Sequence, residues 1–201
     1  MEFIDDVEVL EGHYGTPSEA ARLKVAPRLT RAYAAFVERS RFCILSTVGP
    51  AGTDGSPRGD DRPVVAILDA NRLALPDWRG NQRLDSLRNL VADGRASLMF
   101  FVEGSNVVLR VNGRGRVTAD TDLRARFERA GRQPQTVVVV EIAEVYPQCA
   151  KALMRANLWA GEDRTAGLPT LGDMLREITD GGIDGAAYDA AWPARAANTL
   201  W

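Results

Sequence analysis

The residues best suited to binding an anion are Asn81, Gln82 and Arg83, which follow a glycine and precede a helix predicted at about 84–91. The first turn of a helix exposes unpaired N–H groups and a partial positive charge, so an arginine beside it completes a site for a phosphate. The same spacing also fits a plainer interpretation, in which Asn81 only caps the helix and Arg83 is solvated.

A second pair of polar residues, Ser56 and Arg58, lies just before a predicted buried strand. A hydroxyl and a planar guanidinium are both suited to a phosphate or to the polar edge of a ring. The alternative is a surface turn in which Arg58 and Asp60 form an ion pair of little energetic value.

Alternation marks a third stretch, in which Arg110, Asn112, Arg114 and Arg116 are separated by valine or glycine. Side chains two apart share one face of a strand, so the pattern predicts a strand with a polar face. That face either binds a ligand or meets solvent, and the glycines between the polar residues indicate a bulge or a close backbone approach.

Lys151, Arg155 and Trp159 are spaced four apart and share one face of a helix if that helix extends so far. Two cations and an indole can clamp a planar anionic ligand. In the alternative interpretation the indole belongs to the core and the cations are solvated.

Histidine and cysteine chemistry has little support in the sequence. His13 is the single histidine, and Cys43 and Cys149 show no metal-ligand spacing, which argues against a metal site and against a Ser-His-Asp triad. Both cysteines are expected to be buried as small hydrophobic residues.

Composition argues against nucleic acid and membranes as partners. The 201 residues include 27 acidic and 25 basic side chains, giving a net charge of −2, and Lys24 and Lys151 are the only lysines. Codon bias is the plain explanation for this excess of arginine, and planar recognition of a ligand is a sharper one for a few positions. The acidic N-terminus lacks the features of a secretory signal and no apolar run could span a bilayer, so a cytoplasmic location is expected.

Hydrophobic periodicity predicts how these residues are positioned. Strands are expected at 42–48, 63–68, 72–75, 96–102, 107–117 and 136–145, with a loop or an irregular entry into a strand at 51–60. Helices are expected within 16–37, interrupted by Pro27, and at 84–91, 120–130, 149–158 and 171–178, followed by an Ala/Gly-rich tail.

Hairpin-length loops between most strands disfavour a doubly wound parallel sheet. The prediction is a mainly β (α+β) fold, an antiparallel split β-barrel of about six strands with peripheral helices. We expect a single domain over 1–201, with N-terminal helices in 1–40, the barrel in 41–159 and a C-terminal helix and tail in 160–201.

Taken together, the stretches 56–60, 80–89, 109–114 and 149–155 resemble the FMN-binding split-barrel superfamily that includes pyridoxamine 5′-phosphate oxidase, and in particular its FMN-dependent branch. The resemblance covers about 42–159. It implies the same barrel and a homodimer that binds two FMN molecules at the subunit interface.

The resemblance also implies roles for individual residues. Arg58 and Arg83 would hold the FMN phosphate together with Asn81 and Gln82, and Ser56 would also bind the cofactor. The backbone around Asp77 would meet the polar edge of the flavin. Arg110 and Asn112 would face the pyrimidine edge of the ring, and Lys151, Arg155 and Trp159 would come from the second subunit.

The expected function is that of an FMN-dependent oxidoreductase acting on a small molecule. Pyridoxamine phosphate oxidases proper bind their substrate with a histidine-arginine pair near the C-terminus, and this chain has no histidine after His13, so that activity is not expected. A non-catalytic flavin carrier or redox sensor is the alternative on the same fold, and a deazaflavin or no cofactor is a third.

Overall fold

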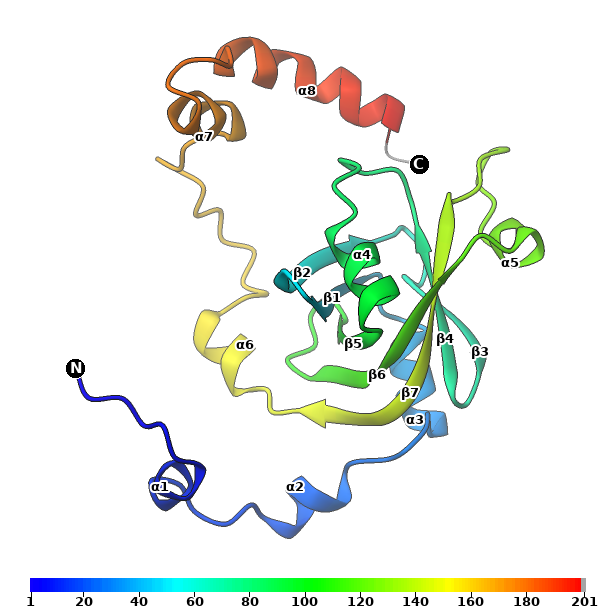
Figure 1. Ribbon diagram of the computed structural model, residues 1–201, viewed down its shortest axis with the longest axis vertical. Helices are drawn as coiled ribbons and strands as arrows, with labels where there is room; N and C mark the ends of the chain where they lie inside the picture. Colours follow the sequence, from blue (N-terminus) through cyan, green and yellow to red (C-terminus); the bar gives the residue numbers. More distant parts are fainter. Residues whose placement is uncertain (200–201) are drawn as a thin grey trace.

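Seven strands form one curved antiparallel sheet in the computed structural model, which describes residues 1–199 (Figure 1). The strands are β1 (Phe42–Gly49), β2 (Gly52–Gly59), β3 (Ala66–Asp69), β4 (Arg72–Asp77), β5 (Arg95–Phe101), β6 (Val108–Thr118) and β7 (Thr136–Gln148). Their order is β2-β1-β5-β6-β7-β4-β3, so β2 and β3 are the two edges and the sheet is not closed. The prediction of a mainly antiparallel β fold with helices around it is confirmed.

The sheet has seven strands and not the predicted number of about six, because β2 occupies the segment expected to be a loop or an irregular entry into a strand. Its glycines, Pro57 and short polar residues are typical of turns. Among residues 1–199, β2 is an edge strand that pairs only with β1, in a register that sets Pro57 opposite Ile44. An edge strand tolerates a residue without an N–H donor, so composition alone did not reveal it.

The core lies on one face of the sheet. Cys43, Leu45, Leu98, Phe100 and Val111 are completely buried and belong to one apolar cluster. In β7, Val137, Val138 and Val140 are also fully buried. Since neighbouring residues of a strand point to opposite faces, this part of β7 is covered on both.

Residues 1–199 also form eight helices: α1 (Val7–Gly12), α2 (Glu19–Leu23), α3 (Arg31–Val37), α4 (Asp85–Ala92), α5 (Thr121–Ala125), α6 (Lys151–Ala156), α7 (Leu171–Ile178) and α8 (Gly185–Thr199). α7 has the predicted bounds, whereas α1 was not expected and α8 replaces the expected tail. α5 ends earlier than predicted because the chain turns into a small hairpin bridged at Arg129 and Arg132. No helix of the described part has the length and apolar character needed to cross a membrane.

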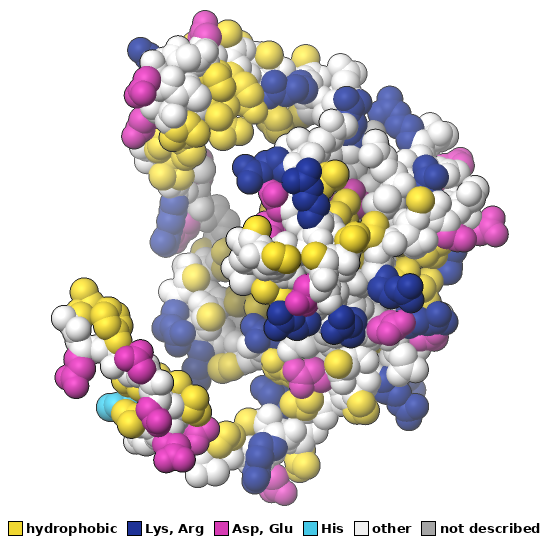
Figure 2. Space-filling model, viewed as in Figure 1, with side chains coloured by type: hydrophobic (Ala, Val, Ile, Leu, Met, Phe, Trp, Pro, Cys, Tyr) yellow, Lys and Arg dark blue, Asp and Glu magenta, His cyan; other side chains and the backbone are white. Residues whose placement is uncertain are grey.

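Both ends of the chain extend away from the sheet as arms (Figure 1). Every residue in 1–23 and in 160–170 is exposed. Figure 2 shows apolar side chains on α7 and α8 that face the space between these helices and the sheet. The arms therefore take no part in the core.

The two cysteines differ in exposure, and the expectation that both are buried was wrong for Cys149. Cys43 is buried in β1, and that burial raises the pKa of its thiol to about 12. Cys149 lies in the turn after β7, outside the core. We expect one thiol per native chain to react with a thiol reagent at pH 8 and the second only after denaturation. The variant Cys149→Ala should give no fast reaction, and a fast reaction in that variant would contradict the burial of Cys43.

Candidate functional site

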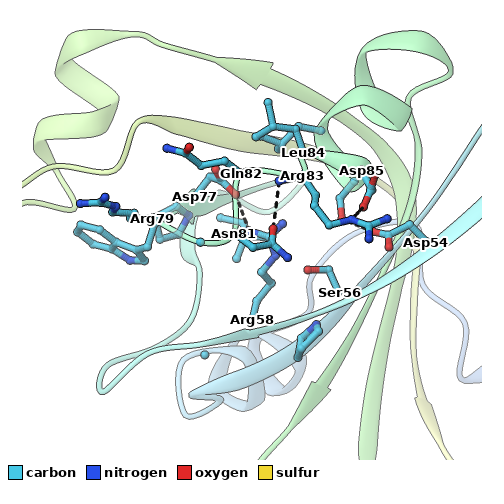
Figure 3. Close-up of a pocket in the computed structure, with 18 of the residues that line it drawn as sticks. Asp54, Ser56, Arg58, Asp77, Arg79, Asn81, Gln82, Arg83, Leu84 and Asp85 are labelled. Atoms are coloured by element: carbon cyan, nitrogen blue, oxygen red, sulfur yellow. Dashed lines mark hydrogen bonds and ion pairs between the residues drawn. The ribbon is translucent and has the colours of Figure 1, made fainter. Parts of the chain in front are cut away.

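A cleft of about 700 Å³ lies between β2, the end of β4 and the loop that leads into α4 (Figure 3). This volume is in the range of small-ligand sites. Six of the predicted site residues line the cleft: Ser56, Arg58, Asp77, Asn81, Gln82 and Arg83. They come from three separate elements, and the fold brings them to one place.

Arg58 occupies the centre of this cleft. Its Nη1 atom donates to Oδ1 of Asp77 over 2.5 Å, and the two side chains are only 18% and 16% exposed. Its Nε atom is buried and has no hydrogen-bond partner within residues 1–199. Because an unpaired buried donor is costly, a bound acceptor at this position would be stabilised. The alternative interpretation, a surface turn with an Arg58–Asp60 ion pair, does not describe this site.

The loop before α4 presents backbone donors to the same cleft. Gln82 and Leu84 adopt left-handed conformations, with φ of 61° and 63°. Oδ1 of Asn81 accepts a hydrogen bond from the N–H of Arg83 over 3.1 Å, so Asn81 shapes the loop and does not cap the helix. The N-cap position belongs to Leu84, whose side chain makes no capping bond, and this leaves the first N–H groups of α4 without a side-chain acceptor.

Acidic groups balance the cations around the helix terminus. The Nε atom of Arg83 donates to Asp85 over 2.8 Å, and the Arg83 side chain is 74% exposed. The hydroxyl of Ser86 donates to Asp54, which also lines the cleft. Arg83 is therefore an exposed residue at the rim of the cleft, in contrast to the more enclosed Arg58.

A buried ion pair that the sequence did not reveal lies just after the end of β2, and one of its partners, Asp60, lines the cleft. Arg129 pairs with Asp60, and their side chains are 10% and 6% exposed. Burial raises the pKa of the Asp60 carboxyl, with the N–H of Arg62 and the Arg129 guanidinium acting in the opposite direction. The partners are 69 residues apart, and no local pattern joins them.

The structure does not bring Arg110 and Asn112 into this cleft. Cross-strand pairing sets Arg58 beside the buried Cys43, whereas Arg110 lies beside Met99 and Tyr146 on the opposite face of the sheet. The predicted sharing of one face by Arg110 and Asn112 agrees with this pairing. Asn112 donates to Glu144 over 2.7 Å, and Arg110 approaches the Tyr146 hydroxyl at 3.4 Å.

The predicted group of Lys151, Arg155 and Trp159 also lies outside the cleft of its own chain. α6 ends at Ala156, so Trp159 does not continue the helical face of Lys151 and Arg155. The Trp159 indole N–H donates to the carbonyl of Ser105 over 2.8 Å, and the two cations are exposed. Among residues 1–199, no group of three or more His, Cys, Asp or Glu side chains could hold a metal ion.

Comparisons with solved structures return proteins that match a little over half of this chain. HupZ of Group A Streptococcus is 12% identical, with a TM-score of 0.48 over 59% of this chain and 93% of that chain. A putative pyridoxamine 5′-phosphate oxidase from Lactobacillus delbrueckii is 19% identical, with a TM-score of 0.48 over 60% and 95%. An FMN-binding protein from Syntrophomonas wolfei is 12% identical, with a TM-score of 0.43 over 58% and 88%.

No curated protein matches the chain. A family model described as pyridoxamine 5′-phosphate oxidase matches residues 29–149. This range is more than half of the 201 residues and contains every residue that lines the cleft. The chain therefore belongs to the pyridoxamine 5′-phosphate oxidase family.

Proposed function

We propose that this protein binds FMN in the cleft and uses it to oxidise or reduce a small molecule. The observation that carries the proposal is Arg58, a largely buried cation whose Nε atom has no hydrogen-bond partner among residues 1–199. The start of α4, which has no side-chain cap, lies at the same cleft. Both features favour a phosphate group. Family membership supports a flavin phosphate over other phosphates.

The cleft residues divide into two roles in this proposal. Arg58 holds the phosphate from inside the cleft, where the phosphate competes with Asp77 for the guanidinium. Ser56, Asn81, Gln82 and Arg83 surround it from β2 and from the loop. The flavin supplies the redox chemistry, and the chain supplies binding, orientation and charge.

The ring end of the site requires a second copy of the chain. Arg110 and Asn112 lie on the face of the sheet opposite to Arg58 and outside the cleft. We therefore place the flavin ring at a homodimer interface, where Lys151, Arg155 and Trp159 of a second subunit close the site. The exposure of both cations in the single chain is compatible with this arrangement.

Three measurements test the proposal. Protein purified from a flavin-sufficient host should show the absorbance of bound FMN, and apoprotein should quench the fluorescence of added FMN with one site per chain. Steady oxygen consumption with an added reductant indicates turnover, whereas binding without turnover favours the carrier or sensor. Failure to bind FMN would contradict the proposal, and binding of a deazaflavin in its place would favour the third hypothesis.

Arg83→Ala should weaken FMN binding by about 1.5 kcal/mol, the lower end for a hydrogen bond to a charged group. The reason for the modest effect is that Arg83 is exposed and already paired with Asp85. Fluorescence titration of apoprotein measures the dissociation constant. Arg88→Ala, which removes an exposed arginine from α4 outside the cleft lining, is the matched control. Equal affinities for the two variants would remove Arg83 from the site.

A further inference from the structure

We propose that Arg129 is a positioning residue for the flavin phosphate. Through its ion pair with Asp60, it keeps the end of β2, and therefore Arg58, in place when the phosphate displaces Asp77. This inference rests on the proposed function. It concerns a residue outside the cleft lining, in the segment between α5 and β7.

The pair formed by Arg129 and Asp60 is enclosed on both sides. The Arg129 side chain is 10% exposed and that of Asp60 is 6% exposed, and a second guanidinium nitrogen lies 2.6 Å from Asp61. A buried charge pair holds its geometry firmly, because separating the partners leaves a desolvated charge. Asp61 is 64% exposed, so the fixed contact is the one to Asp60.

Asp60 is directly coupled to Arg58 through the backbone. Every second residue from β2 to the position that follows it is less exposed than its neighbours; these residues are Asp54, Ser56, Arg58 and Asp60. The N–H of Asp60 donates to the carbonyl of Arg41 over 2.9 Å, at the end of the β1–β2 pairing. Because an edge strand is held by one neighbour only, its end frays unless other contacts fix it.

The segment that carries Arg129 contacts both walls of the cleft. At one end Arg129 reaches Asp60 beyond β2, and at the other the N–H of Gln135 donates to the carbonyl of Asp77 at the end of β4. Two ion pairs therefore connect β2 and the residue that follows it to the opposite wall. Arg58–Asp77 lies inside the cleft, and in Asp60–Arg129 the carboxylate lines the cleft while the arginine lies outside its lining.

Ligand binding affects these two ion pairs differently. A phosphate that binds Arg58 competes directly with Asp77, which weakens the inner connection. Asp60 lines the cleft but Arg129 does not, so a phosphate in the cleft can reach the guanidinium of Arg58 and not that of Arg129, and the outer pair keeps its cation. The position of Arg58 in the bound state therefore depends on Arg129.

The test compares FMN with riboflavin, which shares the ring and ribityl chain but lacks the phosphate. In Arg129→Gln the dissociation constant for FMN should rise about tenfold, the equivalent of one lost hydrogen bond to a charged group, while that for riboflavin changes less than about twofold. A purely structural role for Arg129 would weaken both ligands equally and leave their ratio unchanged. Fluorescence quenching of the full-length apoprotein measures both constants.

Two further variants complete the design. Arg129→Lys keeps one charge beside Asp60 and should give a ratio of dissociation constants between those of the wild type and Arg129→Gln. If Arg129→Gln does not fold, the lysine variant decides, and a wild-type ratio in it overturns the proposal. Arg126→Gln is the matched control, since Arg126 is exposed in the same segment, and it should keep the wild-type ratio.

The outcomes distinguish failure of the proposed FMN binding from failure of the role proposed for Arg129. Wild-type protein that does not bind FMN overturns the proposed function and the role of Arg129 together. Wild-type protein that prefers FMN, with the same preference in Arg129→Gln, overturns the role of Arg129 alone. A preference lost in Arg129→Gln, retained in Arg126→Gln and partly restored in Arg129→Lys supports it.

Discussion

Replacing Arg58 with glutamine is expected to weaken FMN binding by about 2–3 kcal/mol, roughly 30- to 150-fold in the dissociation constant. The variant removes the enclosed cation and leaves Asp77 as an uncompensated carboxylate facing the phosphate. Loss of attraction and gain of repulsion act in the same direction, so the effect should exceed that of Arg83→Ala. Titration of apoprotein with FMN at moderate ionic strength measures it.

Asp77→Asn is a control that should change the affinity for FMN in the opposite direction. Without the carboxylate, Arg58 has no internal competitor, and FMN should bind more tightly while the apoprotein becomes less stable. The double variant Arg58→Gln/Asp77→Asn should recover part of the affinity lost in Arg58→Gln, because the repulsion is gone. If Arg58→Gln binds FMN as the wild type does, Arg58 does not hold the phosphate.

Local sequence patterns predicted most helices and strands, because the spacing of apolar residues in a segment reflects which of those residues are buried. The consecutive valines of β7 and the alternation in β6 reflect packing against neighbouring strands. The sequence left the segment of β2 open between a loop and an irregular strand, because an edge strand needs neither a continuous apolar run nor a full set of N–H donors. Composition therefore separates a polar edge strand from a loop poorly, and pairing with β1 decides the structure.

The sequence predicted which single residues belong to the site, but it did not predict which residues form ion pairs with them. Arg58 and Arg83 were recognised by their place before a strand and a helix, and the fold brings both to one cleft. The partner of Arg58 lies 19 residues away and that of Asp60 lies 69 residues away, so neither ion pair has a local signature. Alternation likewise placed Arg110 and Asn112 on one face without specifying which face of the sheet.

A single methyl group at Gly113 is expected to lower the free energy of unfolding by about 3 kcal/mol or more, the upper range for overpacking. Gly113 lies in β6 at a register shift against β7. A Cβ atom there would lie 1.9 Å from the carbonyl oxygen of Glu141 and 3.2 Å from the backbone N of Ala143. Both are backbone atoms of the neighbouring strand, so the sheet must separate to relieve the clash.

Gly55→Ala is the matched control, because it adds the same methyl group to another strand where no atom lies within 4 Å. Its stability should change by about 0.5 kcal/mol or less. Urea unfolding followed by intrinsic fluorescence measures both variants, and equal midpoints would show that β6 and β7 approach less closely at Gly113. A selective loss in Gly113→Ala ties the glycine to strand packing. Since that packing sets the register of Asn112 with Glu144, the glycine also fixes which polar side chains the sheet presents on the face opposite the cleft.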